Sequence, residues 1–223
     1  MIITEPALAR GIEREFKHLI NILSAIKEEL YMKSDVIFLN NLNNQGNLTP
    51  ENILNASIIG TPLGKMIAIA NQNSLCLLEF LDRKKLEHNI IKLIKITNSL
   101  LVPKPTAVTE MVKTELSNYF QGTLKKFTTP LFSIGTNFQQ KVWEELQKID
   151  FGLTHSYANV AQRINQPTAC RAVAGANSRN RICIIIPCHR IINANGSLGG
   201  YSADIYRKEW LLNHEKQYID SNI

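Results

Sequence analysis

The sequence has few cysteines, and their arrangement suits neither a metal site nor a disulfide framework. Cys76, Cys170, Cys183 and Cys188 form no CxxC pair and show no Cys/His spacing typical of zinc, so no metal is expected. Four cysteines in 223 residues are also too few for a disulfide scaffold. We expect reduced thiols, with Cys76, Cys170 and Cys183 acting as small buried apolar side chains.

Long apolar runs are missing as well. No stretch approaches the ~20 apolar residues of a membrane-spanning helix. Glu5, Arg10 and Glu13 interrupt any early apolar core of the kind found in a signal peptide. A hydrophobic content of 44% and a charged content of 20% are ordinary for a soluble globular protein. We therefore expect no membrane association and a cytoplasmic location.

Acidic side chains are absent from one long stretch, since neither Asp nor Glu occurs from Phe151 to Ala203. A positive field of this kind favours a polyanion such as DNA. The net charge of +6 and the isoelectric point near 9.1 agree, although they are weak indications by themselves. The arginines of the stretch are Arg163, Arg171, Arg179, Arg181 and Arg190.

The hydrophobic pattern divides the chain into three parts. Apolar residues at spacings of three and four over 8–33 predict an amphipathic packing helix, and the polar residues 40–47 predict a linker. We expect an N-terminal extension over 1–55, a middle domain over 56–132 and a C-terminal domain over 133–223. A chain of this length can hold two small domains.

The middle domain has the pattern of a small α/β unit without evident chemistry. A turn at 61–64 precedes two short apolar runs, 66–70 and 74–81, which predict a hairpin. Helices are predicted over 83–97 and 108–120.

The C-terminal domain is predicted to be mainly helical. Ser156 and Thr168 are placed to cap the second and third helices, and two short helices joined by a tight turn are typical of a helix-turn-helix. The predicted helices cover 137–149, 157–164, 169–176 and 207–215.

The third of these helices carries small side chains. Ala169, Ala172 and Ala174 let another backbone come close. That neighbour is either a helix or DNA. Arg171 and the lack of acidic residues support DNA as the alternative to a helix.

The strongest chemical signal is a cysteine between a proline and a histidine. An apolar β-branched run, which predicts a strand, ends at Pro187, and Cys188 and His189 follow. A positive field or a neighbouring histidine lowers the pKa of a thiol. His189 is a candidate base, directly or through a water. Glu215 is a candidate to orient it, although spacing does not distinguish Glu215 from Glu209, and an inert buried pair is the alternative.

Taken together, these residues resemble a known family, the O6-alkylguanine-DNA alkyltransferases, from about residue 138 to residue 215. The resemblance implies an α/β N-terminal domain of the ribonuclease-H-like type and a mainly α, winged-helix-like C-terminal domain with a helix-turn-helix. The matching segments are Phe138-Gln139-Gln140-Lys141-Val142-Trp143, Ser156-Tyr157, Pro167-Thr168-Ala169-Cys170-Arg171-Ala172-Val173, Asn180, Ile186-Pro187-Cys188-His189-Arg190, Gly199-Gly200-Tyr201 and Arg207-Lys208-Glu209-Trp210-Leu211-Leu212.

The resemblance also implies a reaction. The alkyl group of O6-alkylguanine, and of O4-alkylthymine, in double-stranded DNA would pass irreversibly to Cys188. The protein would act once, as a monomer, without a cofactor. It would bind the minor groove and extrude the damaged base, at a cost of a few kcal/mol.

Catalytic roles follow from the same resemblance. Cys188 would accept the alkyl group, and His189 would relay the thiol proton through a water toward Glu215. Tyr201 would hydrogen-bond N3 of the leaving guanine. Asn180 would be the hinge between the helix-turn-helix and the active-site strand.

Roles in DNA binding are implied for the two short helices. Arg171 would fill the gap of the extruded nucleotide, and Tyr157 would press on the phosphate 3′ to it. Ala169, Ala172 and Ala174 would permit close approach to the minor groove.

The base pocket would be lined by Ser202 and the backbone carbonyl of Ile191, with Lys208 nearby. Asp204 stands where the family often has glycine, and an acidic side chain there would weaken DNA binding or restrict bulky adducts. The chain lacks the cysteine cluster of the family's fused regulators, so no inducible regulator is inferred.

Three rival functions remain. A non-catalytic lesion binder would lack the cysteine, which is present here. A helix-turn-helix regulator that senses oxidants would react with peroxide but not with alkylguanine. A Cys-His hydrolase would need an oxyanion hole, which the sequence does not identify.

Overall fold

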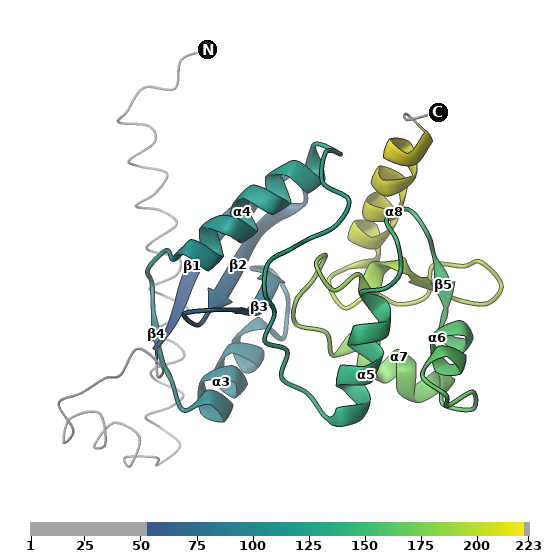
Figure 1. Ribbon diagram of the computed structural model, residues 1–223, viewed down its shortest axis with the longest axis horizontal. Helices are drawn as coiled ribbons and strands as arrows, with labels where there is room; N and C mark the ends of the chain where they lie inside the picture. The colour runs from purple at the N-terminus through teal and green to yellow at the C-terminus, as the bar shows by residue number, and fades with distance from the viewer. Residues whose placement is uncertain (1–52, 221–223) are drawn as a thin grey trace.

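The computed structural model describes residues 53–220, so the predictions for 8–33 and 40–47 lie outside the described residues. Figure 1 shows two units side by side, a small sheet flanked by helices and a mainly helical unit. No helix within 53–220 is long and apolar enough to span a bilayer.

The first unit is built on a four-stranded mixed sheet with strand order β3-β2-β1-β4. Its central strands are antiparallel, and β4 lies parallel to β1. The predicted turn at 61–64 and the predicted hairpin are confirmed, and the backbone of Gly64 has the positive φ of 115° that favours glycine. The strands are β1 (Ile53–Thr61), β2 (Gly64–Ala70), β3 (Leu75–Phe80) and β4 (Leu100–Val102).

The two helices of this unit cover opposite faces of the sheet, because strand side chains alternate between the faces. Ile67 and Ile69 of β2 pack with α3 (Leu86–Thr97). Met66 and Ala68 share a core with α4 (Ala107–Phe120) and with the second unit. The sheet is therefore buried on both sides.

The second unit consists of short helices joined by irregular segments. The predicted cap at Ser156 is confirmed, since its side chain accepts a hydrogen bond from the Asn159 amide. The predicted cap at Thr168 is wrong: Ala169 holds the N-cap position, and no side chain caps this helix. The elements are α5 (Asn137–Leu146), β5 (His155–Ser156), α6 (Tyr157–Arg163), α7 (Cys170–Ser178), the 3₁₀ helix η2 (Cys188–Arg190), β6 (Ile191–Ile192) and α8 (Ile205–Asp220).

The strand predicted before Pro187 is not formed. Only Ile182 makes an isolated bridge, to Leu78, and the residues after it form turns and bends. Ile184 has a φ of 71°, which breaks extended backbone and is rare for a β-branched residue. The apolar run reflects burial between the two units rather than sheet pairing, and periodicity cannot separate these cases.

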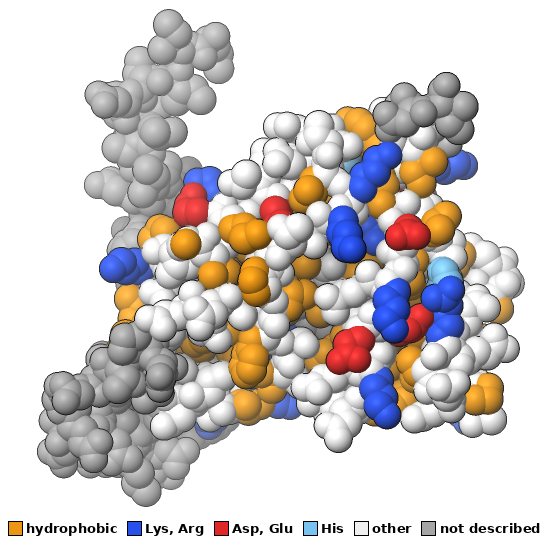
Figure 2. Space-filling model, viewed as in Figure 1, with side chains coloured by type: hydrophobic (Ala, Val, Ile, Leu, Met, Phe, Trp, Pro, Cys, Tyr) orange, Lys and Arg blue, Asp and Glu red, His pale blue; other side chains and the backbone are white. Residues whose placement is uncertain are grey.

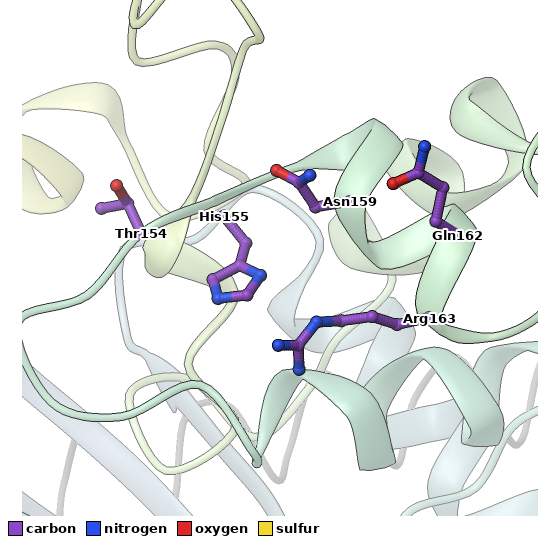
Figure 3. Close-up of a pocket in the computed structure, with 5 residues that line it drawn as sticks. All are labelled: Thr154, His155, Asn159, Gln162 and Arg163. Carbon is purple, nitrogen blue, oxygen red and sulfur yellow. The ribbon is translucent and has the colours of Figure 1, made fainter.

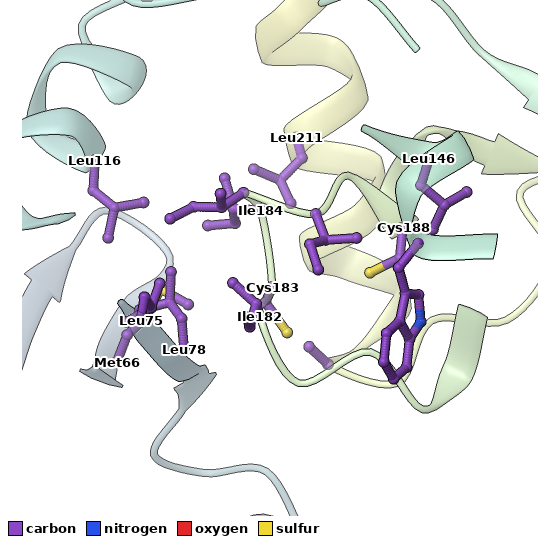
Figure 4. Packing of buried hydrophobic residues seen from close by; sticks show 14 of the residues in the cluster. Met66, Leu75, Leu78, Leu116, Leu146, Ile182, Cys183, Ile184, Cys188 and Leu211 are labelled. Carbon is purple, nitrogen blue, oxygen red and sulfur yellow. The ribbon is translucent and has the colours of Figure 1, made fainter. Parts of the chain in front are cut away.

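The two units join along the outer edge of β3, the edge that does not face β2. Leu78 donates its amide to the Arg181 carbonyl and accepts from the Cys183 amide, both at 2.8 Å. One hydrophobic core continues across this junction, and Figure 4 shows Leu78 of β3 beside Ile182 and Cys183. The edge strand is thereby covered by the segment that leads to Cys188.

Candidate active site

The thiol of Cys188 lies at the start of η2, where its side chain is only 1% exposed. Asn180 holds it: the Asn180 amide nitrogen donates to Sγ at 3.1 Å and to the Ile186 carbonyl at 2.9 Å. The Asn180 side-chain oxygen accepts from the Ile182 amide at 2.9 Å. Asn180, the predicted hinge residue, therefore ties the end of α7 to the thiol.

Burial decides the protonation of this thiol. The pKa of Cys188 is raised by burial, although the Asn180 hydrogen bond and the positive charges of Arg83 and Lys208 act in the opposite direction. The prediction of a lowered pKa from the sequence is therefore wrong for the free protein. A low-dielectric site penalises the thiolate more than these groups stabilise it, so burial favours the protonated thiol.

His189 is completely buried and contacts a carboxylate. Its Nε2 lies 2.8 Å from Oε1 of Glu215, while its Nδ1 is buried without a hydrogen-bond partner among the described residues. Burial lowers the pKa of His189, and the opposing influence of Glu215 is smaller. The imidazole is neutral at physiological pH and can accept a proton.

Glu215 is the predicted orienting carboxylate, and the structure resolves the ambiguity with Glu209, which is exposed. Arg190 donates from Nε to Oε2 at 2.9 Å and from Nη2 to Oε1 at 3.0 Å. The Tyr119 hydroxyl donates to Oε1 at 2.7 Å, and the Gly152 amide to Oε2 at 2.9 Å.

This set of donors overcomes the cost of burial. Burial alone would raise the pKa of Glu215, but the hydrogen bonds from His189 and Arg190 and the positive charge of Arg190 lower it well below its ordinary value. The carboxylate is thus permanently ionised and can stabilise a positive charge on the imidazole.

The arginines of the acid-free stretch do not form one surface. Arg190 is buried against Glu215, and Arg163 pairs at 2.9 Å with Glu145, which precedes the stretch. Arg171 and Arg179 are exposed. Figure 2 shows basic side chains gathered over the second unit but interspersed with acidic ones. Of the arginines in this stretch, Arg171 and Arg179 are thus exposed without an acidic partner in an ion pair among the described residues, whereas Arg163 and Arg190 are each paired with a glutamate.

Two polar groups in the segment after Gly200 have no hydrogen-bond partner of normal geometry among the described residues. The hydroxyls of Tyr201 and Ser202 are both buried without a hydrogen-bond partner of normal geometry, although the Tyr201 hydroxyl is close enough to Cys188 to influence its thiol. Burial first, and the nearby Cys188 second, raise the pKa of Tyr201 well above its ordinary value. Buried polar groups are normally satisfied, so both hydroxyls retain the capacity for a further hydrogen bond.

Lys208 holds the loop that carries these hydroxyls. Its buried ammonium donates to the carbonyls of Ile191 and Leu198, and to that of Gly200 at 3.5 Å. Burial lowers the pKa of Lys208 to about 8. The Ile191 carbonyl, predicted to line the base pocket, is therefore already engaged by Lys208.

The residues predicted to contact DNA lie on α6 and α7 and next to them. Arg171 and Ala172 are exposed, while Ala169, Ala174 and Tyr157 are partly exposed. Burial raises the pKa of Tyr157, and the nearby Cys188 adds to this. Tyr157 thus lies between the outer surface and the thiol.

A separate polar hollow of about 310 Å³ lies beside α6 and contains none of the predicted site residues. Figure 3 shows His155 and Arg163 directed toward each other there. Its lining residues are Thr154, His155, Asn159, Gln162 and Arg163. Within residues 53–220, no group of His, Cys, Asp and Glu is arranged to hold a metal.

Several residues of the site were not foreseen from the sequence. Tyr119 belongs to the first unit, and nothing in its local sequence indicates a contact with α8. Asn177 donates to the Cys188 carbonyl at 3.3 Å, and Trp143 donates to the Ala176 carbonyl at 3.0 Å. Trp143 and Arg190 lay within segments that match the family, but no role was inferred for them. Of the cysteines predicted to be buried, Cys76 and Cys183 are buried, but Cys170 is partly exposed.

Comparison with known proteins agrees with this geometry. Residues 137–217 match the DNA-binding domain of 6-O-methylguanine DNA methyltransferase, and residues 55–132 match its ribonuclease-like domain. The methylated-DNA–protein-cysteine methyltransferase of Methanosarcina acetivorans is 37% identical over 163 residues, which cover 71% of this chain and 96% of that protein. Its counterpart from Mycobacterium leprae is 46% identical over 118 residues, which cover 53% and 71%.

A solved structure gives the same result for the fold. The crystal structure of Mycobacterium tuberculosis OGT in complex with DNA superposes with a TM-score of 0.64 and 36% identity, covering 74% of this chain and 94% of that one. Both units of this chain are matched by family models. The chain therefore belongs to the methylated-DNA–protein-cysteine methyltransferase family.

Proposed function

We propose that this chain repairs alkylated DNA by transferring the alkyl group from O6-alkylguanine, and from O4-alkylthymine, to Cys188. The observation that carries the proposal is the arrangement around the thiol: Asn180 fixes Sγ, the His189–Glu215 pair follows directly, and the unpaired Tyr201 hydroxyl lies beside it. No other thiol in the described residues has these neighbours.

The chemistry requires one bond to form and one to break. The sulfur attacks the alkyl carbon, an S–C bond forms, and the bond between that carbon and O6 breaks. The thiol proton passes through a water to Nδ1 of His189, whose charge Glu215 stabilises. Tyr201 donates a hydrogen bond to N3 of the departing base. The proton that His189 accepted returns through water to this base, which leaves as guanine. Since no base removes the alkyl group from the thioether, each molecule acts once.

The damaged base must leave the duplex to reach a buried thiol. We assign DNA binding to α6 and α7 as a helix-turn-helix, with Ala169, Ala172 and Ala174 facing the minor groove. Arg171 replaces the extruded nucleotide in the base stack, and Tyr157 turns the adjacent phosphate. Extrusion costs a few kcal/mol, and the inserted side chain offsets part of that cost.

The extruded base would be held beside the thiol by the loop after β6. Ser202 and Tyr201 offer unpaired hydroxyls, and Lys208 stiffens the loop through three backbone carbonyls. The proposal includes a monomer that acts in the cytoplasm without a cofactor, and the division of the chain into 1–55, 56–132 and 133–223.

The reaction is tested with a duplex that contains one O6-methylguanine. We expect the protein to remove one lesion per molecule and then stop, as measured by the modified base remaining in hydrolysed DNA. The Cys188→Ala variant should bind the same duplex and remove none. Repeated turnover, or removal by the variant, would reject the assignment; tight binding without removal by the unaltered protein would make it a lesion binder.

The role of Arg171 is tested separately. Arg171→Ala should slow transfer from duplex DNA by about 10-fold or more, since the unstacked duplex loses a stabilising contact. Transfer from the free base O6-methylguanine should be unaffected. Equal losses with both substrates would reject the role in extrusion, and Arg179→Ala, a second exposed arginine on the same unit, is the matched control.

A further inference from the structure

We propose that Arg83, in the first unit, is a positioning residue for Cys188: it clamps the backbone at Asn180 and supplies a positive charge that favours the reactive thiolate. This inference rests on the proposed function, since it concerns the same thiol. It gives the first unit, which shows no chemistry in its sequence, a defined part in the reaction.

The Arg83 side chain is linked to the Cys188 site first by hydrogen bonds to the backbone at the end of α7. Arg83 follows β3 and its side chain is only 6% exposed. Nη1 donates to the Asn180 carbonyl at 3.3 Å, and Nη2 donates to the Ser178 carbonyl at 3.4 Å. A planar guanidinium can hold two such acceptors in one orientation, which a lysine cannot. Arg83 therefore fixes the end of α7 from the other unit.

A buried carboxylate holds the guanidinium in place. Arg83 pairs with Glu79 of β3, and Asn89 of α3 donates to both oxygens of Glu79 at 3.0 and 3.1 Å. All three residues belong to the first unit, so the position of Arg83 is set there. The cluster of Glu79, Arg83 and Asn89 is called the β3 cluster below.

The hydrogen bonds of β3 reinforce this clamp. Asn180 lies between the Ser178 carbonyl, bound by Arg83, and the Arg181 carbonyl, bound by the Leu78 amide. The side chain of Asn180 in turn donates to Sγ of Cys188. Movement of the first unit would therefore tilt the amide that supports the thiol.

The positive charge of Arg83 is its second link to Cys188. Burial raises the pKa of Cys188, and Arg83 is among the groups that oppose this rise. In a low-dielectric interior a fixed positive charge acts over a longer range than in water. Lys208 is the other cation that acts on the thiol, and burial lowers its pKa to about 8. The other ionisable groups around the thiol are Tyr157, Cys183, His189 and Tyr201.

The test measures how transfer depends on pH. The substrate is the free base O6-methylguanine, which removes DNA binding from the measurement. Arg83→Gln should raise the apparent pKa of the reacting thiol by about half to one pH unit, and should slow transfer below that pKa about 3- to 10-fold. Arg83→Lys should restore the pKa while leaving transfer slower, because one ammonium cannot hold both carbonyls. Lys84→Gln, which removes an exposed neighbouring charge, is the matched control.

A second variant separates charge from folding. Arg83→Gln leaves Glu79 buried without its cation, so the double variant Glu79→Gln/Arg83→Gln restores neutrality and thermal stability. It should still show the raised thiol pKa. A rate that falls equally at every pH, with an unshifted pKa in both variants, would overturn the role in positioning the thiolate.

Failure of the proposed function can be distinguished from failure of the role inferred for Arg83. Titration of Cys188 in protein labelled with ¹³C at the cysteine β-carbon, with its signal assigned by its loss in Cys188→Ala, reports the thiol pKa without any transfer. A shifted titration in Arg83→Gln supports the inference even if O6-methylguanine does not react, and an unshifted one rejects it.

Discussion

Two buried glutamates, one in each unit, have opposite properties. Glu79 and Glu215 are both 0% exposed, and each pairs with an arginine. Burial raises the pKa of Glu79 to about 7, with Arg83 and Asn89 opposing it. Glu215 has donors from His189, Arg190, Tyr119 and Gly152, and its pKa is well below the ordinary value.

The difference shows that burial alone does not set the ionisation of a carboxylate. Each further charge-assisted hydrogen bond favours the ionised form. Glu215 has enough of them to remain an anion beside His189, as a proton relay requires. Glu79 has fewer, and its part is to hold Arg83. The number of donors thus separates a carboxylate suited to catalysis from one suited to support.

The largest effect is expected from removing the charge of Glu215. Glu215→Gln leaves Arg190 buried without its anion and leaves His189 without its carboxylate partner. The free energy of unfolding should therefore fall by about 3–5 kcal/mol. Alkyl transfer should slow by about 100-fold or more. Denaturant unfolding and single-turnover rates measure the two effects. Glu209→Gln, exposed on the same helix, is the control, and equal behaviour of the two variants would contradict the assignment.

A smaller effect is expected from one donor to Glu215. Tyr119→Phe keeps the ring of α4 in the core but removes its hydrogen bond to Oε1. A hydrogen bond to a charged group contributes about 1.5–3 kcal/mol, so the free energy of unfolding should fall by about that amount and transfer should slow less than in Glu215→Gln. Unchanged stability would show that the remaining donors suffice.

The dependence of stability on pH should reveal Glu79. Its folded pKa of about 7 lies above the unfolded value of 4.5, so the folded state binds the proton more tightly. The stabilising contribution of this proton is complete below 4.5 and is lost as pH rises through about 7. Between pH 5 and pH 8, the free energy of unfolding of the unaltered protein should therefore decline by on the order of 1–3 kcal/mol. Glu79→Gln should abolish this decline.

Urea unfolding at several pH values measures this slope. Glu87→Gln, an exposed carboxylate of α3, should leave it unchanged. A slope that is the same in Glu79→Gln and in the unaltered protein would show that Glu79 is ionised throughout, like Glu215.

The smallest effect is expected at an exposed ion pair between the units. Arg207 contacts Asp82 at 2.7 and 2.9 Å, but the Asp82 side chain is 66% exposed. Exposed pairs contribute about 0–1 kcal/mol, so Asp82→Ala should lower the free energy of unfolding by no more than that in a urea titration. A loss of several kcal/mol would mean that this pair, rather than the buried clusters, joins the units.

Local signals in the sequence were sufficient for part of the site. The periodicity of the helices in both units and the cap at Ser156 are confirmed. Thr168 was misread, because the turn before α7 places Ala169 at the N-cap. The strand before Pro187 was also misread, since burial between two units produces the same apolar run as a buried strand.

The remaining parts of the site depend on contacts between distant segments. Glu215 could not be separated from Glu209 by spacing, whereas their exposures separate them at once. Tyr119 of α4 and Arg83, which follows β3, come from the first unit and reach the site only through contacts between the two units. The pKa of Cys188 required knowing that the thiol is buried, which a count of nearby arginines does not give. The roles in DNA binding of Arg171, Tyr157 and the α7 alanines stay predictions.

The central claim, that Cys188 accepts the alkyl group, is tested most directly by mapping the product. The protein is incubated with duplex DNA containing O6-methylguanine, and intact mass and peptide masses are then measured. The account predicts a gain of one methyl group per molecule, located on Cys188 and absent from Cys76, Cys170 and Cys183. A methyl group on another cysteine, or no gain in mass despite bound DNA, would contradict it.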